Sequence, residues 1–191
     1  MSWVERIAEV TRARPDRRDI AWAPVDAELG AAVPSDFREL CALFGDRYFN
    51  GFLRLMSPTA EDGVLYWFRT HRRNSRYDHL YAPYEMYRGP DQPGLLRWGD
   101  DMTEGEYYWL ADARVDPGRW PVVARRDGLE PWHRYEIGVA EFLHRMLTDD
   151  GFTPFTVAGT ASRSFVLPEG VMITSAEEWN FWAGGDSSTG G

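Results

Sequence analysis

The residue types that could carry chemistry gather in one stretch, Gly94 to Trp120, where carboxylates alternate with aromatic rings. Two carboxylates can form a general acid/base couple in glycosidases, but no spacing here supports that pair over a solvated turn. Aromatic anchors with a polar rim are typical of protein-binding surfaces. We therefore take four acids as candidate partner-binding residues: Asp100, Asp101, Glu104 and Glu106. The competing interpretation, slightly favoured by sequence alone, turns the rings into the core and leaves the acids to solvate a hairpin.

A second cluster consists of four arginines with no acid between them, which are Arg69, Arg72, Arg73 and Arg76. They are candidates for contacting phosphate or another anion. The alternative is a solvated helix face whose charges pair with acids elsewhere, and we favour it because charge runs usually lie in solvent.

Other catalytic signatures are missing from the sequence. The four His residues form no HxH or HExxH pattern, and a zinc site needs three or four ligands at workable spacing, so no metal is expected. Cys41 has apolar neighbours and is expected to be a buried, inert thiol. No GxSxG, Walker or GxGxxG motif is present. We expect a protein that is not an enzyme and uses no cofactor.

Composition narrows the class of partner. The 191 residues are 43% hydrophobic and 15% aromatic, which suffices for a sizeable core. The net charge of -9 argues against a nucleic-acid binder, which needs a basic face, and permits a basic protein partner. No apolar run reaches about 18 residues and no signal peptide is recognised, so we expect no membrane span and a cytoplasmic location.

The first part of the chain predicts helices. Ser2 and Glu5 form a capping-box pattern for a helix over residues 3–13, followed by a polar linker. A second helix is expected from Val25, capped by Asp26 and ended by Leu29-Gly30. A third is expected to be capped by Ser35 and to end at Gly45.

Strand signals follow. Residues 48–56 predict one strand, and 81–87 an edge strand broken by Pro83. Residues 59–80 fit either a helix or a strand with a loop. The Gly94–Trp120 stretch predicts two strands joined by a polar turn, and residues 120–127 and 132–137 predict two more joined at Asp127-Gly128.

A helix is expected from Val139 to Leu147. Beyond Gly151, the runs at 152–157, 164–168 and 171–174 read as short strands or an extended arm, and Ser175 with Glu178 predicts a cap for a final helical turn.

These elements predict an α+β fold with a mostly antiparallel central sheet and flanking helices. We divide the chain into an N-terminal helix and linker (1–24), a central domain (25–150), a C-terminal extension packed on that domain (151–185) and a disordered tail (186–191).

Several motifs that follow one another along the central part of the chain resemble those of the SUKH superfamily of the Smi/Knr type, in the style of its actinobacterial members. The first motif has Leu29, Gly30, Pro34, Asp36, Phe37 and Phe44-Gly45 in place, with Val33 where Leu is usual. The second matches at Leu95, Leu96, Trp98, Gly99, Asp101, Gly105 and Trp109, with Glu106 where Asp is commoner. The remaining matches are Trp120-Pro121-Val122, Trp132 and Glu141-Phe142-Leu143. The resemblance covers about Val25 to Asp150, and the order and spacing of the motifs are its specific part.

The resemblance implies a SUKH-like α+β fold in which six residues mainly define the structure: Trp98, Gly99, Gly105, Trp109, Trp120 and Trp132. It also implies an immunity protein that binds and neutralises a polymorphic toxin, often a nuclease. It carries no catalytic residue and leaves the oligomeric state open.

Three functions therefore stay open from sequence. The first is a toxin-neutralising protein whose acidic-aromatic surface docks on a basic toxin domain. The second is a regulatory or scaffold protein that binds host proteins. The third, least favoured, is an enzyme acting on an anionic ligand through the Arg69–Arg76 segment, with His71 or His79 nearby.

Overall fold

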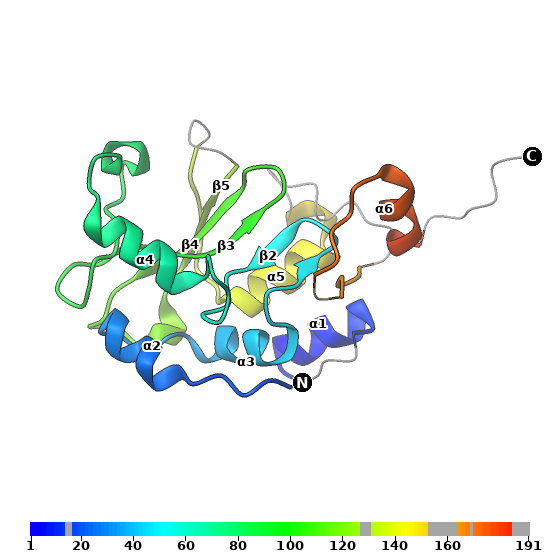
Figure 1. Cartoon of the computed structure of the whole chain (residues 1–191), viewed down its shortest axis with the longest axis horizontal. Helices are drawn as coiled ribbons and strands as arrows, with labels where there is room; N and C mark the ends of the chain where they lie inside the picture. Colours follow the sequence, from blue (N-terminus) through cyan, green and yellow to red (C-terminus); the bar gives the residue numbers. More distant parts are fainter. Residues whose placement is uncertain (14–16, 127–130, 153–163, 169, 185–191) are drawn as a thin grey trace, which may run out of the picture.

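The computed structural model describes residues 1–13, 17–126, 131–152, 164–168 and 170–184. Within these residues, helices flank one antiparallel sheet (Figure 1), which confirms the predicted α+β class. The expected Asp127-Gly128 turn, most of the 152–157 run and the 186–191 tail lie outside the described residues.

The sheet is a meander in which each strand pairs antiparallel with the next along the chain. Its strands, in both chain and spatial order, are β1 (Tyr48–Phe49), β2 (Leu53–Leu55), β3 (Gly94–Asp101), β4 (Glu106–Ala111), β5 (Val122–Arg125) and β6 (His133–Tyr135).

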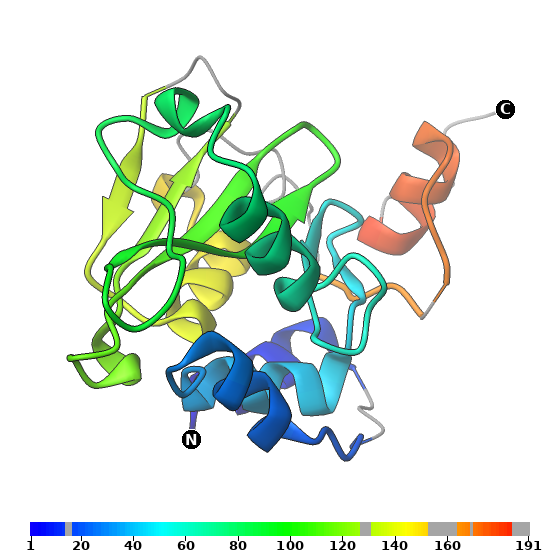
Figure 2. The same ribbon diagram turned by 60° about the vertical axis from the view of Figure 1, so that its left-hand side comes forward.

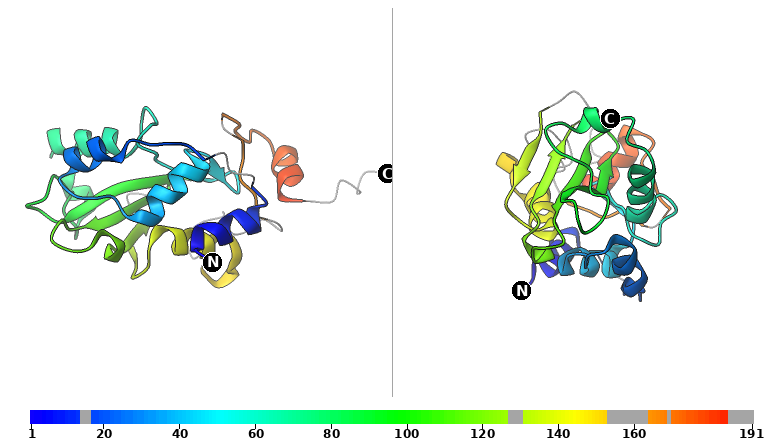
Figure 3. Two further views of the ribbon diagram at one scale, coloured as in Figure 1. Left: turned by 90° about the horizontal axis from the view of Figure 1, so that it is seen from below. Right: turned by 90° about the vertical axis from the view of Figure 1, so that its left-hand side faces the viewer.

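The helices surround this sheet on several sides (Figure 2). They are α1 (Trp3–Thr11), α2 (Trp22–Leu29), α3 (Ser35–Phe44), α4 (Val64–Arg73), α5 (Val139–Thr148) and α6 (Ala176–Ala183), with short 3-10 turns η1 (Asp78–Tyr81), η2 (Pro117–Arg119) and η3 (Asp150–Phe152). Helices α4 and α6 lie at opposite ends of the long axis of the molecule (Figures 1 and 3).

The N-terminal capping box is confirmed. The Glu5 backbone N–H donates to Ser2 Oγ over 3.1 Å, and the Ser2 backbone N–H donates to Glu5 Oε2 over 2.6 Å. Two of the four unpaired donors at this helix end are thereby satisfied reciprocally. The helix ends two residues earlier than expected, at Thr11, with Arg12 in a left-handed conformation at φ 52°.

The caps predicted for the next two helices are wrong. Helix α2 begins at Trp22, so Asp26 lies inside it, accepts the Val33 N–H over 3.1 Å and pairs with Arg38 over 2.6 Å. Ser35 is the first residue of α3, after Pro34, and makes no capping hydrogen bond. In both cases the helix extends further toward its N-terminus than the capping residue type indicated.

The single strand predicted for residues 48–56 is also wrong. Asn50 and Gly51 adopt positive φ values of 49° and 72°, and the Phe52 N–H donates to the Phe49 carbonyl over 3.0 Å. Asn-Gly is a strong hairpin signal because both residues tolerate left-handed backbone. The segment folds into the β1–β2 hairpin.

Of the two alternatives for residues 59–80, the helix is the one observed, as α4 and η1. The edge strand expected at residues 81–87 is wrong. Tyr81 belongs to η1, the Ala82–Pro83 peptide bond is cis, and Met86 makes an isolated bridge to Leu95. A proline without an N–H cannot extend a strand ladder at this position.

One face of the sheet holds the main core. Trp98, Tyr107 and Trp109 are fully buried there. The Phe37 ring of α3 meets Trp109 edge-on at 4.8 Å between centroids, and the Phe142 ring of α5 meets Trp98 at 6.0 Å. Edge-to-face contacts add to the large area that such rings remove from water. The hairpin aromatics therefore serve the core and are not surface anchors.

The C-terminal extension attaches to the free edge of β1. The Leu167 N–H donates to the Tyr48 carbonyl over 3.0 Å, and the Phe165 N–H donates to Asn50 Oδ1 over 2.9 Å. Helix α6 follows, with the predicted Ser175 cap accepting the Glu178 N–H over 3.2 Å.

We predict that Trp109→Ala lowers the free energy of unfolding by about 3–5 kcal/mol, because it removes a buried ring and leaves a cavity. Urea denaturation followed by circular dichroism measures it. Tyr77→Ala, at a half-exposed ring, is the control and should leave the unfolding midpoint nearly unchanged. A Trp109→Ala midpoint equal to that of the control would contradict the core assignment.

Candidate functional site

A one-residue bulge in β3 decides which hairpin side chains lie on which face. Arg97 pairs with Tyr108, but Gly99 pairs with Tyr107, so Trp98 is the extra residue. Side chains alternate along a strand, so residues three apart would normally lie on opposite faces, and an added residue removes that alternation. Arg97 and Asp100 therefore share the face opposite Trp98.

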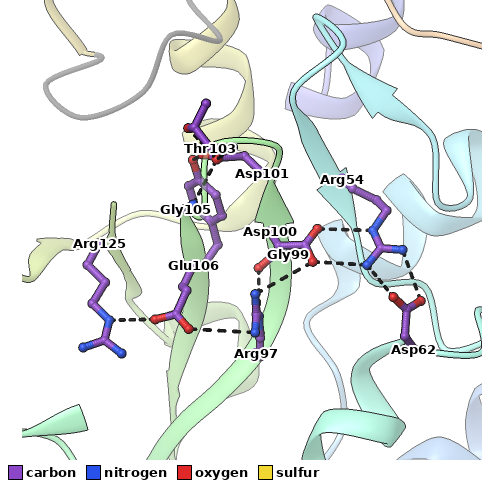
Figure 4. A network of polar contacts seen from close by, with 11 residues as sticks. Arg54, Asp62, Arg97, Gly99, Asp100, Asp101, Thr103, Gly105, Glu106 and Arg125 are labelled. Carbon is purple, nitrogen blue, oxygen red and sulfur yellow. Dashed lines mark hydrogen bonds and ion pairs between the residues drawn. The ribbon is translucent and has the colours of Figure 1, made fainter. Parts of the chain in front are cut away.

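On this face an ion-pair network crosses four strands (Figure 4), which we call the charged row. Register places Arg54 beside Asp100, Asp100 beside Glu106, and Glu106 beside Arg125. Arg97, on the same face of β3, and Asp62, from the loop before α4, complete the row. The row alternates in sign across the sheet: Asp62, Arg54, Asp100, Arg97, Glu106 and Arg125.

The contacts at the two ends of the charged row are close. Arg54 Nη2 lies 2.7 Å from Asp62 and 3.1 Å from Asp100, while Arg125 Nε lies 2.7 Å from Glu106. Arg97 sits between the two acids at longer range, 3.8 Å from Asp100 and 3.9 Å from Glu106. Two adjacent carboxylates would repel each other, and the Arg97 guanidinium between them offsets that repulsion.

Aromatic rings and partial burial also act on the arginines of the charged row. The guanidinium of Arg97 lies 4.5 Å from the Trp67 ring, and that of Arg125 lies 4.2 Å from the Trp132 ring. Burial disfavours charged Arg54, but its hydrogen bonds to Asp62 and Asp100 outweigh this and raise its pKa. The bond from Arg54 lowers the pKa of Asp62. Asp100 and Glu106 are thus engaged inside the molecule.

Asp101 organises the turn between β3 and β4. Its Oδ1 accepts hydrogen bonds from the Thr103 N–H at 2.8 Å, the Thr103 hydroxyl at 2.8 Å and the Gly105 N–H at 2.9 Å. Its Oδ2 accepts the Tyr107 hydroxyl at 2.6 Å, and the residue is buried. A carboxylate with four donors is a structural group and is withdrawn from any partner.

Glu104 is the only one of the four candidate acids that the structure leaves exposed, among the described residues, and it has a positive φ of 68°. Met102 beside it is 48% exposed. The interpretation slightly favoured from sequence, in which the hairpin rings turn into the core, is therefore confirmed for the rings. Asp100, Asp101 and Glu106 have partners within the molecule, and a role for them in partner binding stays a prediction. The tip alone, Met102 to Glu104, faces outward.

The six residues expected to define the fold are glycines with no room for a side chain and tryptophans that are buried or hydrogen-bonded. A Cβ at Gly105 would lie 2.1 Å from the Asp101 carboxylate, and one at Gly99 would lie 2.9 Å from the Arg54 carbonyl. Trp120 is buried and donates to the Asp112 carbonyl over 2.9 Å, whereas Trp132 lies on the opposite face and donates to the Ala82 carbonyl over 3.0 Å. Trp98 and Trp109 belong to the core already described.

The four arginines lie on and just after α4. Arg69 pairs with Glu28 of α2 over 2.6 Å, and Arg72 stacks on Phe68. Arg72, Arg73 and Arg76 are exposed and form no ion pair in the described part of the chain. His71 is half-buried against Trp67 and Tyr81, where burial lowers its pKa, and His79 is exposed. The arrangement is a basic helix face.

The one cysteine, Cys41, is buried, as the sequence predicted, and burial raises the pKa of its thiol. In the described ranges no three or more His, Cys, Asp or Glu side chains are arranged to hold a metal ion.

A surface that the sequence did not single out lies around α6, and we call it the acidic-apolar end. Phe181 is 74% exposed and Met172 53% exposed. Glu177 and Glu178 are exposed on the same helix, and residues 170–184 contain no Arg or Lys. Glu177 and Glu178 stand four and three residues before Phe181 and therefore share a helix face with it, and an exposed ring set among acids indicates a contact surface.

The acidic-apolar end is continuous with the tip of the β3–β4 turn through Phe52. The Met102 N–H donates to the Phe52 carbonyl over 3.1 Å. Phe52 also lines a shallow cavity of about 390 Å³ together with Ile173, Ala176 and Trp179. Trp179 donates to the Asn50 carbonyl over 3.2 Å, which fixes α6 against the β1–β2 turn. We count as the acidic-apolar end the exposed or partly exposed residues on these elements, which are Phe52, Met102, Glu104, Met172, Glu177, Glu178 and Phe181.

Comparisons of this chain with protein-family models, with curated proteins and with solved structures gave no match. In the part of the chain that the structure describes, the helices are all too short or too polar to cross a membrane.

Sequence reasoning missed the three arginines of the charged row. Arg54 and Arg97 stand singly inside strands, Arg125 ends β5 next to Arg126, and only strand register brings the three beside the acids. The acidic-apolar end had a weak signal, an aromatic and acidic run after Ser175 with no basic residue.

We predict that Asp101→Ala lowers the free energy of unfolding by about 3 kcal/mol, because it leaves buried donors of Gly105 and Tyr107 without an acceptor. Chemical denaturation measures the loss. Glu104→Gln, three residues away and exposed, is the matched control and should leave the unfolding midpoint unchanged. Equal midpoints for the two variants would show that the turn does not depend on Asp101.

We further predict that Arg125→Met destabilises the protein by about 3 kcal/mol, since it leaves the Glu106 carboxylate half-buried without its closest cation. Arg114→Met, which breaks an exposed pair with Asp112, should have no measurable effect. Thermal unfolding of both variants at low and at high salt makes the test. The charged row would be energetically unimportant if Arg125→Met unfolded at the wild-type temperature.

Proposed function

We propose that this chain is a non-enzymatic protein-binding domain, and more narrowly an immunity protein that neutralises a basic toxin domain. The observation that carries the proposal is the acidic-apolar end, where exposed apolar side chains stand among carboxylates without a neighbouring cation on α6.

The apolar part of this surface supports protein binding. Phe181 keeps 74% of its surface in water although it sits on a helix whose Trp179 and Trp182 pack inward. Burying an aromatic ring of this size stabilises a complex substantially, and such rings are typical hot spots of interfaces. A cavity lined by Phe52 and Trp179, on the side of α6 that packs on the β1–β2 turn, offers a separate place for a partner side chain.

The acidic part supports a basic partner. Glu104, Glu177 and Glu178 lie at this end, and the chain as a whole carries a net charge of -9. A nuclease presents cations to hold phosphate, and an acidic surface is attracted to them at long range. The resemblance of residues 25–150 to SUKH immunity proteins supports the same role, with the binding surface lying largely in the C-terminal extension.

A regulatory or scaffold role is the second candidate, and a specific observation favours it. Three half-exposed side chains, Tyr66, Tyr77 and Leu80, lie in the same segment as Arg72, Arg73 and Arg76, which form no ion pair with any described residue. Aromatic residues and arginine are enriched at interfaces. A scaffold would use this basic face at the α4 end together with the acidic-apolar end.

The test begins with the genes beside the one that encodes this chain. We predict that co-expression of this chain protects cells from a toxin encoded there, and that calorimetry detects a complex with the toxin domain. The variant Phe181→Ala with Glu177→Arg should weaken binding at least tenfold, because it removes the apolar anchor and reverses a charge. Tyr77→Ala with Arg73→Glu, at the opposite end, is the matched control and should bind as wild type.

Two results would contradict the proposal in different ways. Full affinity in the Phe181→Ala/Glu177→Arg variant would show that the surface is wrong while the partner is right. A neighbouring protein that binds but is not toxic would favour the scaffold role instead.

A further inference from the structure

A second cavity has the opposite charge and is separate from the acidic-apolar end. It has a volume of about 410 Å³ and lies where the end of α1, the residue run after α3 and the C-terminal extension meet. Helices α1 and α6 lie toward the same end of the molecule (Figure 1). The cavity is lined by Thr11, Arg12, Ala13, Arg47, Phe165, Val166, Pro168 and Trp182.

The two arginines that line this cavity lack the carboxylate partners common elsewhere in the protein. Arg12 and Arg47 form no ion pair with any residue in the described ranges, in contrast to the paired Arg38, Arg54 and Arg69. The Nε of Arg47 is buried and makes no hydrogen bond. Arg47 as a residue is only partly buried and lines the cavity, and the described lining residues include no carboxylate to offset its charge.

Local backbone brings the arginines to the same cavity. Arg12 adopts a left-handed conformation at φ 52° where α1 ends, and its own N–H donates to the Glu9 carbonyl over 3.1 Å. Arg47 follows Gly45, whose φ of 62° ends α3 and turns the chain toward β1. Both arginines therefore lie just beyond the end of a helix.

The opposite wall is aromatic. The Phe165 and Trp182 rings stack with centroids 6.1 Å apart and planes at 24°. Phe165 is buried beneath, whereas Trp182 is only partly buried and lines the cavity. The C-terminal extension therefore contributes an apolar, flat surface to a cavity that two cations also line.

We propose that this cavity binds a small organic oxyanion, a carboxylate or phosphate carried on an aromatic ring. The guanidinium groups of Arg12 and Arg47 hold the oxyanion, because their planar forks match carboxylate and phosphate oxygens. The ring of the ligand lies against Trp182. The volume lies within the range of small-molecule sites. The site is independent of the proposed toxin-binding role, whose surface and charge are different.

The test uses four small molecules: phenyl phosphate, benzoate, inorganic phosphate and benzyl alcohol. The chain has nine Trp residues, so total fluorescence does not report on one site. NMR resolves the individual indole N–H signals, and the signal that is lost in the Trp182→Phe variant is the one of Trp182. Phenyl phosphate and benzoate should shift the Trp182 signal saturably. Inorganic phosphate, which lacks the ring, and benzyl alcohol, which lacks the charge, should bind at least tenfold more weakly than phenyl phosphate.

Arg47→Met keeps the apolar stem and removes the charge, so it should weaken phenyl phosphate binding at least tenfold. Arg12→Met, at an exposed position, is the second variant in case the first does not fold, and it should also weaken binding. Arg73→Met on α4 is the matched control and should bind as wild type. The proposal is overturned if neither aromatic oxyanion shifts the Trp182 signal, or if both cavity variants bind with wild-type affinity.

Discussion

The extra residue in β3 is the constraint on which the rest of the structure depends. The bulge adds Trp98 between the pairs at Arg97 and Gly99. The Trp98 ring lies on the side of α3 and α5, and Asp100 returns to the side of Arg97. A sheet with an aromatic face and a charged face results. Without the bulge, the side-chain alternation beyond it would reverse, and either the ring or the carboxylate would lie on the wrong face.

The charged row has a consequence for function. The row pairs three acids with three arginines on one face of the sheet, so its net charge is zero. The acids of the hairpin, which look like an acidic surface in sequence, are largely neutralised by these pairs. The net negative charge of the protein therefore comes from acids outside the charged row, and Glu104 at the turn tip and Glu177 and Glu178 on α6 are among them. A charged partner would be guided to these peripheral elements and not to the centre of the hairpin.

The C-terminal extension combines two roles that its sequence does not separate. Its inward residues complete the edge of the sheet at β1, and Trp182 closes the arginine-lined cavity. Its outward residues, above all Phe181, form the acidic-apolar end. One short segment thus protects a sheet edge that would otherwise be open to pairing with another chain, and supplies both surfaces proposed to bind other molecules.

Local patterns were sufficient for much of the fold. The capping pairs at Ser2 and Ser175, the helical spacing before Gly45 and the strong strands on either side of Gly105 all reflect contacts within a few residues, so the sequence contains them directly. The same reasoning failed at Asp26, which a helix that starts earlier overrides, and at Asn50-Gly51, where a turn signal lay inside an apolar run.

The sequence by itself determined the α+β class, most helices and strands, and the burial of Cys41, because these follow from hydrophobic periodicity and short-range capping. Only the tertiary structure decided what the charged residues do. Arg54 meets Asp100 46 residues away, and Arg125 meets Glu106 19 residues away, through a strand register that a bulge shifts. Likewise, Arg12, Arg47 and Trp182 meet only because separate helix ends converge. Side-chain partners at such separations depend on the register and packing of the whole sheet, which local residue patterns do not encode.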